Sequence, residues 1–212
     1  MEYSYIVWDF NGTLLNDVKI GIESINCLLS RRNLPTLENV EAYRKVFGFP
    51  IIDYYRRVGL PVEEEGYPAL AIEWVEEYKS RHPELQEGAL ELLTRFRDAG
   101  IPQILLSATE RNMLLGQLED FGIREFFEEV LGLDNIHAES KLEIARNWRE
   151  THRKANLLYI GDTEHDLQTA TVLGADCILV ANGHENKESL LRYGVPVVDS
   201  LRDILPVLTG EF

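Results

Sequence analysis

Cysteine is scarce in this 212-residue sequence, and long apolar segments are missing. The two cysteines, Cys27 and Cys177, lie far apart in apolar surroundings, and neither belongs to a CxxC pair. This excludes a disulfide framework, and we expect both thiols to be reduced core residues. No apolar run approaches the roughly 18 residues of a membrane-spanning helix, and the beginning of the sequence lacks a basic region. We therefore expect a cytoplasmic protein with no membrane partner.

Basic residues are also few, since 21 lysines and arginines stand against 36 aspartates and glutamates. The net charge of −15 provides no basic cluster that could displace counterions, so we expect no nucleic-acid partner. Self-repulsion of this kind keeps a globular protein in solution, here expected as a monomer or homodimer. The chain is long enough for one sizeable core, or for a core with a small inserted subdomain.

Strand-like and helix-like segments alternate from about residue 87 onward. Short apolar runs predict buried strands over 101–107, 156–160 and 177–181, and shorter strands over 127–131 and 195–198. Helices are predicted between them, over 87–99, 110–121, 141–151 and 164–173. Ser200 and Asp203 form a capping box for a final helix. The alternation is typical of βαβ units, so we expect an α/β protein with a doubly wound, Rossmann-like parallel sheet.

Helical periodicity replaces this alternation between residues 17 and 85. Isoleucines and leucines recur at helical spacing over 20–29, and Leu70, Trp74 and Tyr78 lie four residues apart in a second helix predicted over 64–81. No strand-like run interrupts the region. The simplest account is a helical insert between the first strand and the rest of the sheet, with hinges near 15–17 and 83–87.

The segment IVWDFNGT, residues 6–13, is the most informative part of the sequence. Its three apolar residues indicate the end of a buried strand, and Asp9 follows directly. Ligands of open α/β sheets bind at the carboxyl ends of the strands, so Asp9 is expected at the mouth of a site. Gly12 permits a tight turn whose amides can hold a dianionic group beside a carboxylate nucleophile. An Asx turn and a hairpin turn at Asn11 are the alternatives.

Two later residues also lie at predicted element ends. Ser107 closes the predicted strand 101–107, where its hydroxyl can donate to a phosphate oxygen; a serine in an ordinary strand-to-helix turn is the alternative. Lys141 begins a predicted helix, where a cation opposes the helix macrodipole. It could neutralise a carboxylate or a phosphoryl group, although a solvated lysine is the common case.

The segment GDTEHD, residues 161–166, carries a stronger signal because it directly follows a predicted strand. It places Asp162 and Asp166 four residues apart at a strand-to-helix turn. Carboxylate oxygens of this kind suit Mg²⁺, which binds one or two carboxylates and keeps several waters. Helix capping by Asp162 or Thr163 is the alternative.

These four segments, in this order, resemble the four motifs of the haloacid dehalogenase-like (HAD) phosphatase superfamily. The resemblance covers essentially the whole chain and implies a catalytic core of residues 1–16 and 86–212. It also implies a mobile helical cap, residues 17–85, that closes over the substrate. The layout is similar to that of phosphoglycolate phosphatases and β-phosphoglucomutase-type enzymes. The segment VFGFP, residues 46–50, resembles the cap loop that those proteins place near the substrate.

The resemblance implies a Mg²⁺-dependent phosphatase in which Asp9 attacks phosphorus and becomes a phosphoaspartate. The carbonyl of residue 11 would contribute to the metal site, and Asp166 would bind the ion directly or orient a water on it. The implied metal-site residues are Asp9, Asn11, Asp162 and Asp166, and the implied catalytic residues are Asp9, Asn11 and Lys141. The phosphoryl group would be held at Asn11, Gly12, Ser107, Ala108 and Lys141. Phosphoryl transfer requires this kind of positioning and charge stabilisation.

Asn11 departs from the family pattern, because HAD phosphatases usually have a second aspartate two residues after the nucleophile. That aspartate protonates the leaving alcohol and then activates water, which an amide cannot do at neutral pH. Acid–base catalysis is worth roughly 10²–10⁴-fold. Three interpretations stay open: a substitute such as His165, substrates whose leaving group needs no proton, such as acyl phosphates, or a slow or inactive phospholigand-binding regulatory protein. We predict that alkyl phosphates are hydrolysed poorly relative to aryl or acyl phosphates.

Substrate selection is expected to reside in the insert. Tyr54, Tyr55, Arg56 and Arg57 form a polar-aromatic cluster, and an arginine there could bind a substrate carboxylate such as that of phosphoglycolate. A solvated helix face is the alternative. His184 follows the predicted strand 177–181 and could lie near the edge of the site, and a loop residue without a role is the favoured interpretation. The predicted function is hydrolysis of a small phosphorylated metabolite, either a phosphoglycolate-like monoester or an acyl phosphate. Dehalogenation, phosphonate hydrolysis and a receiver-type signalling role are disfavoured.

Overall fold

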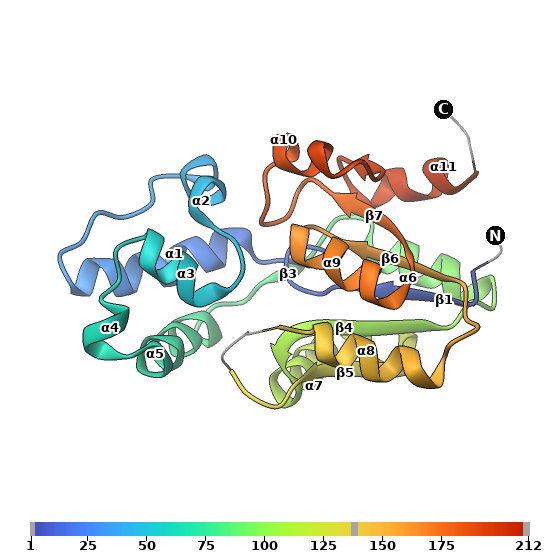
Figure 1. The fold of residues 1–212 in the computed structure, drawn as a ribbon, viewed down its shortest axis with the longest axis horizontal. Coiled ribbons are helices and arrows are strands. Elements are labelled where there is room, and N and C mark those ends of the chain that lie inside the picture. The colour runs from blue at the N-terminus through green and yellow to red at the C-terminus, as the bar shows by residue number, and fades with distance from the viewer. Residues whose placement is uncertain (1–2, 137–139, 210–212) are drawn as a thin grey trace.

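The structure is a computed structural model that describes residues 3–136 and 140–209. Within those ranges a six-stranded sheet has the order β5-β4-β1-β6-β7-β8, and its strands run parallel (Figure 1). The strands are β1 (Tyr5–Trp8), β4 (Gln103–Glu110), β5 (Glu129–Leu133), β6 (Leu157–Gly161), β7 (Asp176–Val180) and β8 (Val197–Val198). The predicted α/β fold with a doubly wound parallel sheet is confirmed.

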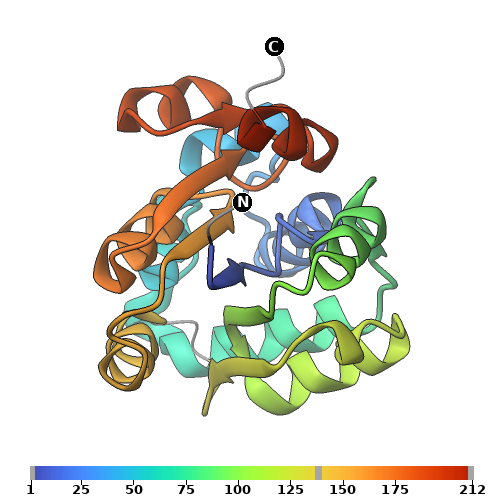
Figure 2. The same cartoon turned by 90° about the vertical axis from the view of Figure 1, so that its right-hand side faces the viewer.

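Two layers of helices cover the sheet. In β1, Ile6 and Trp8 pack with α6 (Ala89–Asp98) and α7 (Arg111–Asp120) in one apolar cluster. Val7, between them, packs with α8 (Leu142–Thr151) and α9 (Glu164–Leu173) in another. This division follows from the alternation of side chains along a strand. Figure 2 shows α8 and α9, gold and orange, on one side of the sheet and the green α6 on the other. Burial on both faces explains why the strands read as continuous apolar runs.

The remaining core elements are short. They are η1 (Arg124–Phe126), α10 (Lys187–Leu190), η2 (Leu191–Tyr193), η3 (Leu201–Asp203) and α11 (Ile204–Thr209). The predicted capping box of Ser200 and Asp203 is present, at the start of the 3₁₀ turn η3. No helix in the described part of the chain has the length and apolarity needed to cross a membrane.

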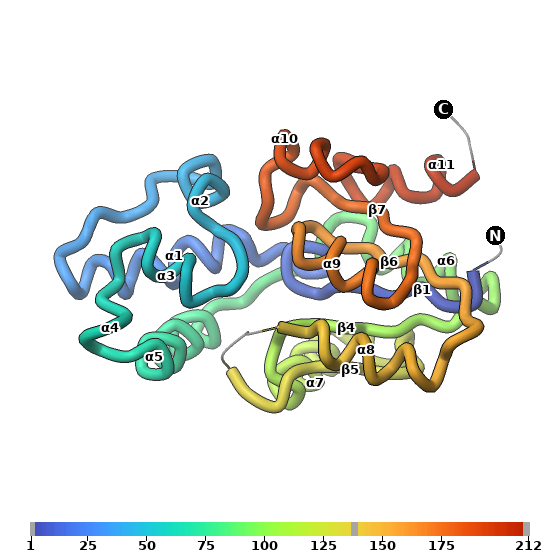
Figure 3. Tube along the Cα trace, viewed as in Figure 1, coloured from blue at the N-terminus to red at the C-terminus, as the bar shows by residue number. Residues whose placement is uncertain are grey.

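Five helices lie between β1 and α6 and form the helical insert, at the left of Figures 1 and 3. They are α1 (Val18–Arg31), α2 (Val40–Val46), α3 (Ile51–Arg57), α4 (Val62–Glu65) and α5 (Tyr67–Lys79). The insert has its own apolar cluster, which includes Ile25, Leu28 and Leu70. The helix predicted over 64–81 is divided into α4 and α5, because Gly66 adopts a φ of +84° between them.

Two short strands join the insert to the core. β2 (Leu15–Asn16) and β3 (Glu84–Leu85) pair antiparallel, with Leu15 opposite Leu85. The chain therefore enters and leaves the insert side by side, at the segments predicted as hinges. The carboxyl ends of β1, β4 and β6 face the insert (Figure 1).

Candidate active site

The candidate site lies where the strand order changes direction. β1 lies between β4 and β6. After β1 the chain forms β4 and β5 on one side of this strand, and it then forms β6, β7 and β8 on the other side. Such a switch point opens a crevice at the carboxyl ends of the strands. Asp9 follows β1 there, and Ser107, Lys141 and Asp162 line the same cavity of about 140 Å³. The structure thus brings together residues from all four predicted motifs.

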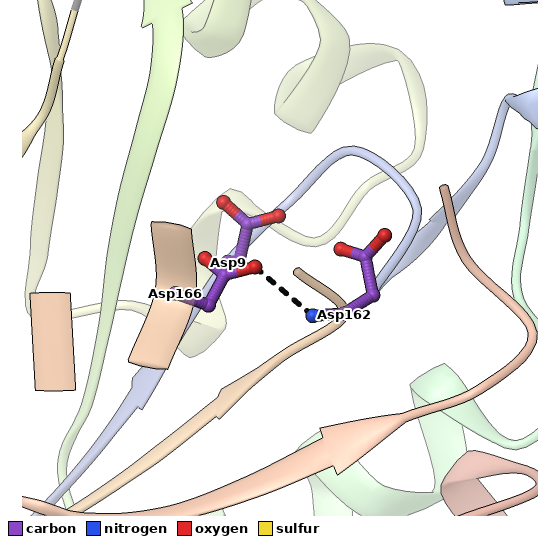
Figure 4. Close-up of side chains that lie close together, drawn as sticks. All are labelled: Asp9, Asp162 and Asp166. Carbon is purple, nitrogen blue, oxygen red and sulfur yellow. Dashed lines mark hydrogen bonds between the residues drawn. The ribbon is translucent and has the colours of Figure 1, made fainter. Parts of the chain in front are cut away.

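Three carboxylates form the floor of the site. Asp9, Asp162 and Asp166 are buried, and each offers an oxygen within 4.8 Å of the others (Figure 4). Oδ2 of Asp166 accepts hydrogen bonds from the backbone amides of Asp162 and Thr163, at 3.0 and 2.9 Å. It also accepts one from the hydroxyl of Thr163, which caps α9. The capping alternative is therefore correct for Thr163, and the first turn of α9 fixes the orientation of the Asp166 carboxylate.

Lys141 lies at the N-cap of α8 and is 2% exposed, so it is not a solvated lysine. Its Nζ contacts Oδ1 of Asp9, lies 2.6 Å from Oδ1 of Asp166, and donates to the carbonyl of Leu106 at 3.3 Å. Burial works against the charged ammonium group, but Asp166 and Asp9 outweigh it and raise the pKa of Lys141. The lysine therefore stays protonated between the nucleophile candidate and the fourth motif.

Three carboxyl groups are crowded around one ammonium group in this cluster. Burial and the charge of Asp166 raise the pKa of Asp9 well above its usual range, although Lys141 opposes them. Burial also raises the pKa of Asp162 to about 7, against the influence of His184. The hydroxyl of Thr13 donates to Oδ1 of Asp162 at 2.8 Å. A buried set of carboxyl oxygens, in which burial and close mutual approach raise the pKa values of Asp9 and Asp162, fits a hard divalent cation that would replace the protons.

Asn11 is held by both ends of its amide. Nδ2 donates to Oδ2 of Asp17 at 2.7 Å and to the hydroxyl of Tyr78 at 3.2 Å. Oδ1 accepts from the hydroxyl of Thr109 at 2.7 Å. Since Tyr78 belongs to α5 and Thr109 to β4, Asn11 connects the helical insert to the sheet.

A buried ion pair lies beside Asn11. Oδ1 of Asp17 accepts from the backbone amide of Gly12 at 2.8 Å and lies 3.2 Å from Nε2 of His184. Nδ1 of His184 is 2.7 Å from the hydroxyl of Tyr43, and its backbone amide donates to Asp162 at 2.6 Å. Burial opposes both charges, yet His184 and the neighbouring donors lower the pKa of Asp17, and Asp17 raises that of His184 to about 9.

His184 lies in the loop after β7 and is buried at the edge of the carboxylate cluster, as the less favoured interpretation of the sequence had it. Asp17 was expected only as part of a hinge. Its sequence signal is a single acid next to Asn16, and its partner His184 lies 167 residues away.

The sequence model of the haloacid dehalogenase-like hydrolases matches residues 6–180. The chain belongs to this family. The phosphoglycolate phosphatase of Photobacterium profundum is 25% identical over 214 residues, which cover 95% of this chain and 90% of that protein. The phosphoglycolate phosphatase of Rhodobacter capsulatus is 24% identical over 186 residues, 84% of each chain. The haloacid dehalogenase-like protein SP0104 of Streptococcus pneumoniae superposes with a TM-score of 0.81, at 19% identity, over 97% of this chain and 98% of that one.

These comparisons confirm two predictions from the sequence. The resemblance to a HAD phosphatase is confirmed, and so is the prediction that the chain is a phosphoric monoester hydrolase of this type. The likeness of the solved structure supports the fold of this HAD hydrolase.

Of the residues predicted to hold a phosphoryl group, Ser107 and Ala108 line the cavity, whereas the amide of Gly12 is used within its own turn. The Ser107 hydroxyl hydrogen-bonds that of Thr109 at 3.1 Å. Gly12 gives its amide to Asp17 and to the carbonyl of Leu15, so this amide is engaged within the turn. Its φ of +75° and an added Cβ only 2.3 Å from Asp162 leave no room for a larger residue.

His165, the predicted substitute for the missing acid, lines the cavity of this HAD hydrolase. Its ring stacks on Phe49 with centroids 4.4 Å apart, and Nε2 is 3.2 Å from the hydroxyl of Ser140. Burial and the charge of Lys141 lower its pKa to about 4. The imidazole is thus neutral at pH 7, so it can accept a proton but is not an acid there.

The polar-aromatic cluster of the insert is divided between the cavity and the surface. Tyr54 and Tyr55 are buried and line the cavity. Arg56 pairs with Asp53 and Glu63 at the surface. Arg57 donates to the carbonyls of residues 46 and 48. Both guanidinium groups are thus engaged away from this cavity, which agrees with the alternative of a solvated helix face rather than with an arginine that binds a substrate carboxylate.

Proposed function

We propose that this HAD hydrolase is a Mg²⁺-dependent phosphatase that acts on a small phosphorylated metabolite through a phosphoaspartate on Asp9. The substrate is a monoester or an acyl phosphate. The contact of buried Lys141 with both Asp9 and Asp166, next to Asp162, carries this proposal. The helical insert then acts as a cap, residues 17–85, over a core of residues 1–16 and 86–212. Because two relatives bear the name phosphoglycolate phosphatase, phosphoglycolate is the first natural compound to assay.

In the first half-reaction, a carboxylate oxygen of Asp9 forms a bond to phosphorus while the bond to the leaving oxygen breaks. The electron pair of that bond departs with the leaving group. Mg²⁺ held by Asp9, Asp162 and the carbonyl of residue 11 would supply positive charge between two anions. Lys141 stabilises the charge that develops on the transferring phosphoryl oxygens. Asp166 holds Lys141 in place, since α9 already fixes its carboxylate.

This site lacks, at position 11, the aspartate that usually protonates the leaving group in HAD phosphatases. The Asn11 amide is held by Asp17, Tyr78 and Thr109, and it has no acidic proton to give to the leaving oxygen. A neutral His165 can accept a proton from the water that hydrolyses the phosphoaspartate, but it does not protonate the leaving group. Leaving groups that are stable as anions are therefore favoured.

A slow or inactive phospholigand-binding protein is the second candidate function. Asn11 is the observation that favours it. The intact Asp9, Lys141, Asp162 and Asp166 favour chemistry, because binding alone does not require a nucleophile.

The proposal is tested by single-turnover and steady-state hydrolysis of p-nitrophenyl phosphate, with and without Mg²⁺, in wild type, Asp9→Asn and Asn11→Asp. We expect a Mg²⁺-dependent burst that is lost in Asp9→Asn. Faster turnover in Asn11→Asp would identify the missing acid–base group as the limit. An inactive wild type with an active Asn11→Asp would instead establish the binding protein. Intact mass at residue 11 is the control, since Asn-Gly sequences deamidate.

A further inference from the structure

The cavity extends from the carboxylate cluster into the helical insert. Asp9 and Lys141 line one end, and side chains from α2, α3 and α5 line the other. Its volume is about 140 Å³. An apolar cavity of about 150 Å³ holds one benzene molecule. The space above Asp9 therefore suits a leaving group no larger than a single ring.

The insert's wall of this cavity is aromatic. Tyr43, Tyr54, Tyr55 and Tyr78 are each at most 3% exposed, and Trp74 stacks on Tyr78 with centroids 5.0 Å apart. Aromatic walls hold flat rings through stacked and edge-to-face contacts, beyond the simple burial of apolar area. The wall therefore favours an aromatic group over a small polar one.

In the described part of the chain, the wall that the insert contributes carries no basic side chain, and the two cations on the core side of the cavity, Lys141 and His184, are already paired with Asp166 and Asp17. Among the described residues of the insert that line the cavity there is no lysine or arginine, and Asp17 is the charged one. Besides Arg56 and Arg57, Arg44 also points elsewhere, since it donates to the carbonyl of Gly183 at 2.9 Å. Because Lys141 and His184 already have anionic partners, a substrate carboxylate buried against the insert would lack a partner of its own, which is costly. A carboxylate-bearing leaving group is therefore disfavoured.

One buried donor in the wall finds no partner among residues 3–136 and 140–209. The hydroxyl of Tyr54, a residue that is 3% exposed, makes no hydrogen bond to any residue in those ranges. Leaving a buried polar group unpaired costs about 1–3 kcal/mol, so such groups usually meet a ligand or a water. A polar substituent on the ring would satisfy this hydroxyl.

From these observations we infer that the site takes phosphate monoesters whose leaving group is one uncharged aromatic ring. The inference rests on the proposed function and names its substrate class. It also agrees with Asn11, which is an independent observation. The pKa of a phenol is near 10, as in tyrosine, whereas the pKa of water is about 15.7. An aryl oxide can thus leave without the proton that Asn11 fails to supply.

Binding and turnover together test the inference. Calorimetry with Mg²⁺ compares benzylphosphonate with 3-phosphonopropionate, which replace the bridging oxygen of phenyl phosphate and phosphoglycolate by carbon. We expect benzylphosphonate to bind at least about tenfold more tightly, and kcat/KM to favour phenyl phosphate over phosphoglycolate by a similar factor. Equal or tighter binding of 3-phosphonopropionate overturns the inference.

Variants of α5 show whether the wall carries the preference. In Trp74→Ala, the ratio of kcat/KM for phenyl phosphate to that for acetyl phosphate should fall about tenfold. In Ile72→Ala, a matched change at an exposed position of α5, it should stay constant. An unchanged ratio in Trp74→Ala contradicts the inference. If no phosphate is hydrolysed, the proposed function fails, and the binding comparison still decides the preference for a ring.

Discussion

At the scale of single residues, a hydrogen bond joins the neutral amide of Asn11 to the charged carboxylate of Asp17. Oδ2 of Asp17 lies 2.7 Å from Nδ2 of Asn11, so an aspartate at position 11 would place two carboxylates in contact. Like charges at this separation repel each other, and two donors of the amide are lost. The missing family aspartate is thus accompanied by an acid six residues later, within reach of the same position.

We expect Asn11→Asp to lower the free energy of unfolding by about 1–3 kcal/mol, because buried donors and acceptors lose their partners. Adding Asp17→Asn to this variant should recover part of the loss, since the amide and the carboxylate then exchange places. Urea unfolding of the wild type, both single variants and the double variant measures the coupling energy. Strictly additive effects would show that the two side chains do not interact.

The His184–Asp17 pair makes stability depend on pH. The pKa of His184 is raised to about 9, because Asp17 outweighs the effect of burial. An unfolded histidine titrates near 6.5. The folded protein therefore holds this proton more tightly, and the stabilisation is complete below about pH 6.5 and lost as the pH rises through about 9. We expect Tm to fall over this interval more steeply in wild type than in His184→Gln, measured with EDTA present. Parallel Tm curves for the two proteins would contradict the ion pair.

The sequence predicts some site residues and misses others for a physical reason. Asp9 and Asp162 directly follow apolar strands, so the rule that ligands bind at strand ends is sufficient to place them. Asp17 belongs to a hinge and His184 to a loop. They meet only because the carboxyl ends of β1 and β7 lie at the same end of the sheet. No spacing along the chain encodes that meeting.

At the scale of elements, a helix or strand can be predicted from the sequence only when it is long enough to show a periodic pattern or has clear end residues. The helix predicted over 164–173 has those bounds, because Thr163 caps its start and Gly174 ends it. β4 instead continues to Glu110, past the predicted end at Ser107, with an irregular register after Leu106. β2 and β3 were not predicted, since two residues cannot show an alternating pattern. For α3 the sequence indicated only a solvated helix face around residues 54–57, without bounds, whereas the helix runs over Ile51–Arg57 and buries Tyr54 and Tyr55.

The insert's own core makes a separate prediction. Leu28 of α1 is fully buried among the helices of the insert. Leu28→Ala should lower the free energy of unfolding by about 2–5 kcal/mol through the cavity it leaves. Leu90 of α6 is 53% exposed, and Leu90→Ala should change it by less than about 0.5 kcal/mol. Denaturant unfolding of both variants measures the difference, and equal destabilisation would place Leu28 outside a packed core.

At the scale of the whole molecule, the proposed metal site would link stability to metal binding. A ligand that binds only the folded state stabilises it by about 2.7 kcal/mol at a hundred times its Kd. We expect Mg²⁺ to raise the Tm of wild type, and EDTA to reverse the effect. In Asp162→Asn the rise should be much smaller, whereas in the exposed Asp98→Asn it should persist. Thermal scans over a range of Mg²⁺ concentrations test this, and an equal rise in all three proteins would mean nonspecific binding.

The paired strands β2 and β3 have a consequence for how such a protein can diversify. The residues proposed to handle the phosphoryl group come from four separate segments of the chain, so a change in that chemistry would require coordinated changes along the whole gene. The aromatic wall comes from one continuous stretch of sequence, residues 43–78. Its two ends lie side by side at Leu15 and Leu85, so one segment can be exchanged for another without moving the sheet. On the proposed function, recombination of this one segment would replace the selectivity, provided that the new segment kept counterparts of Asp17 and Tyr78 as partners for Asn11.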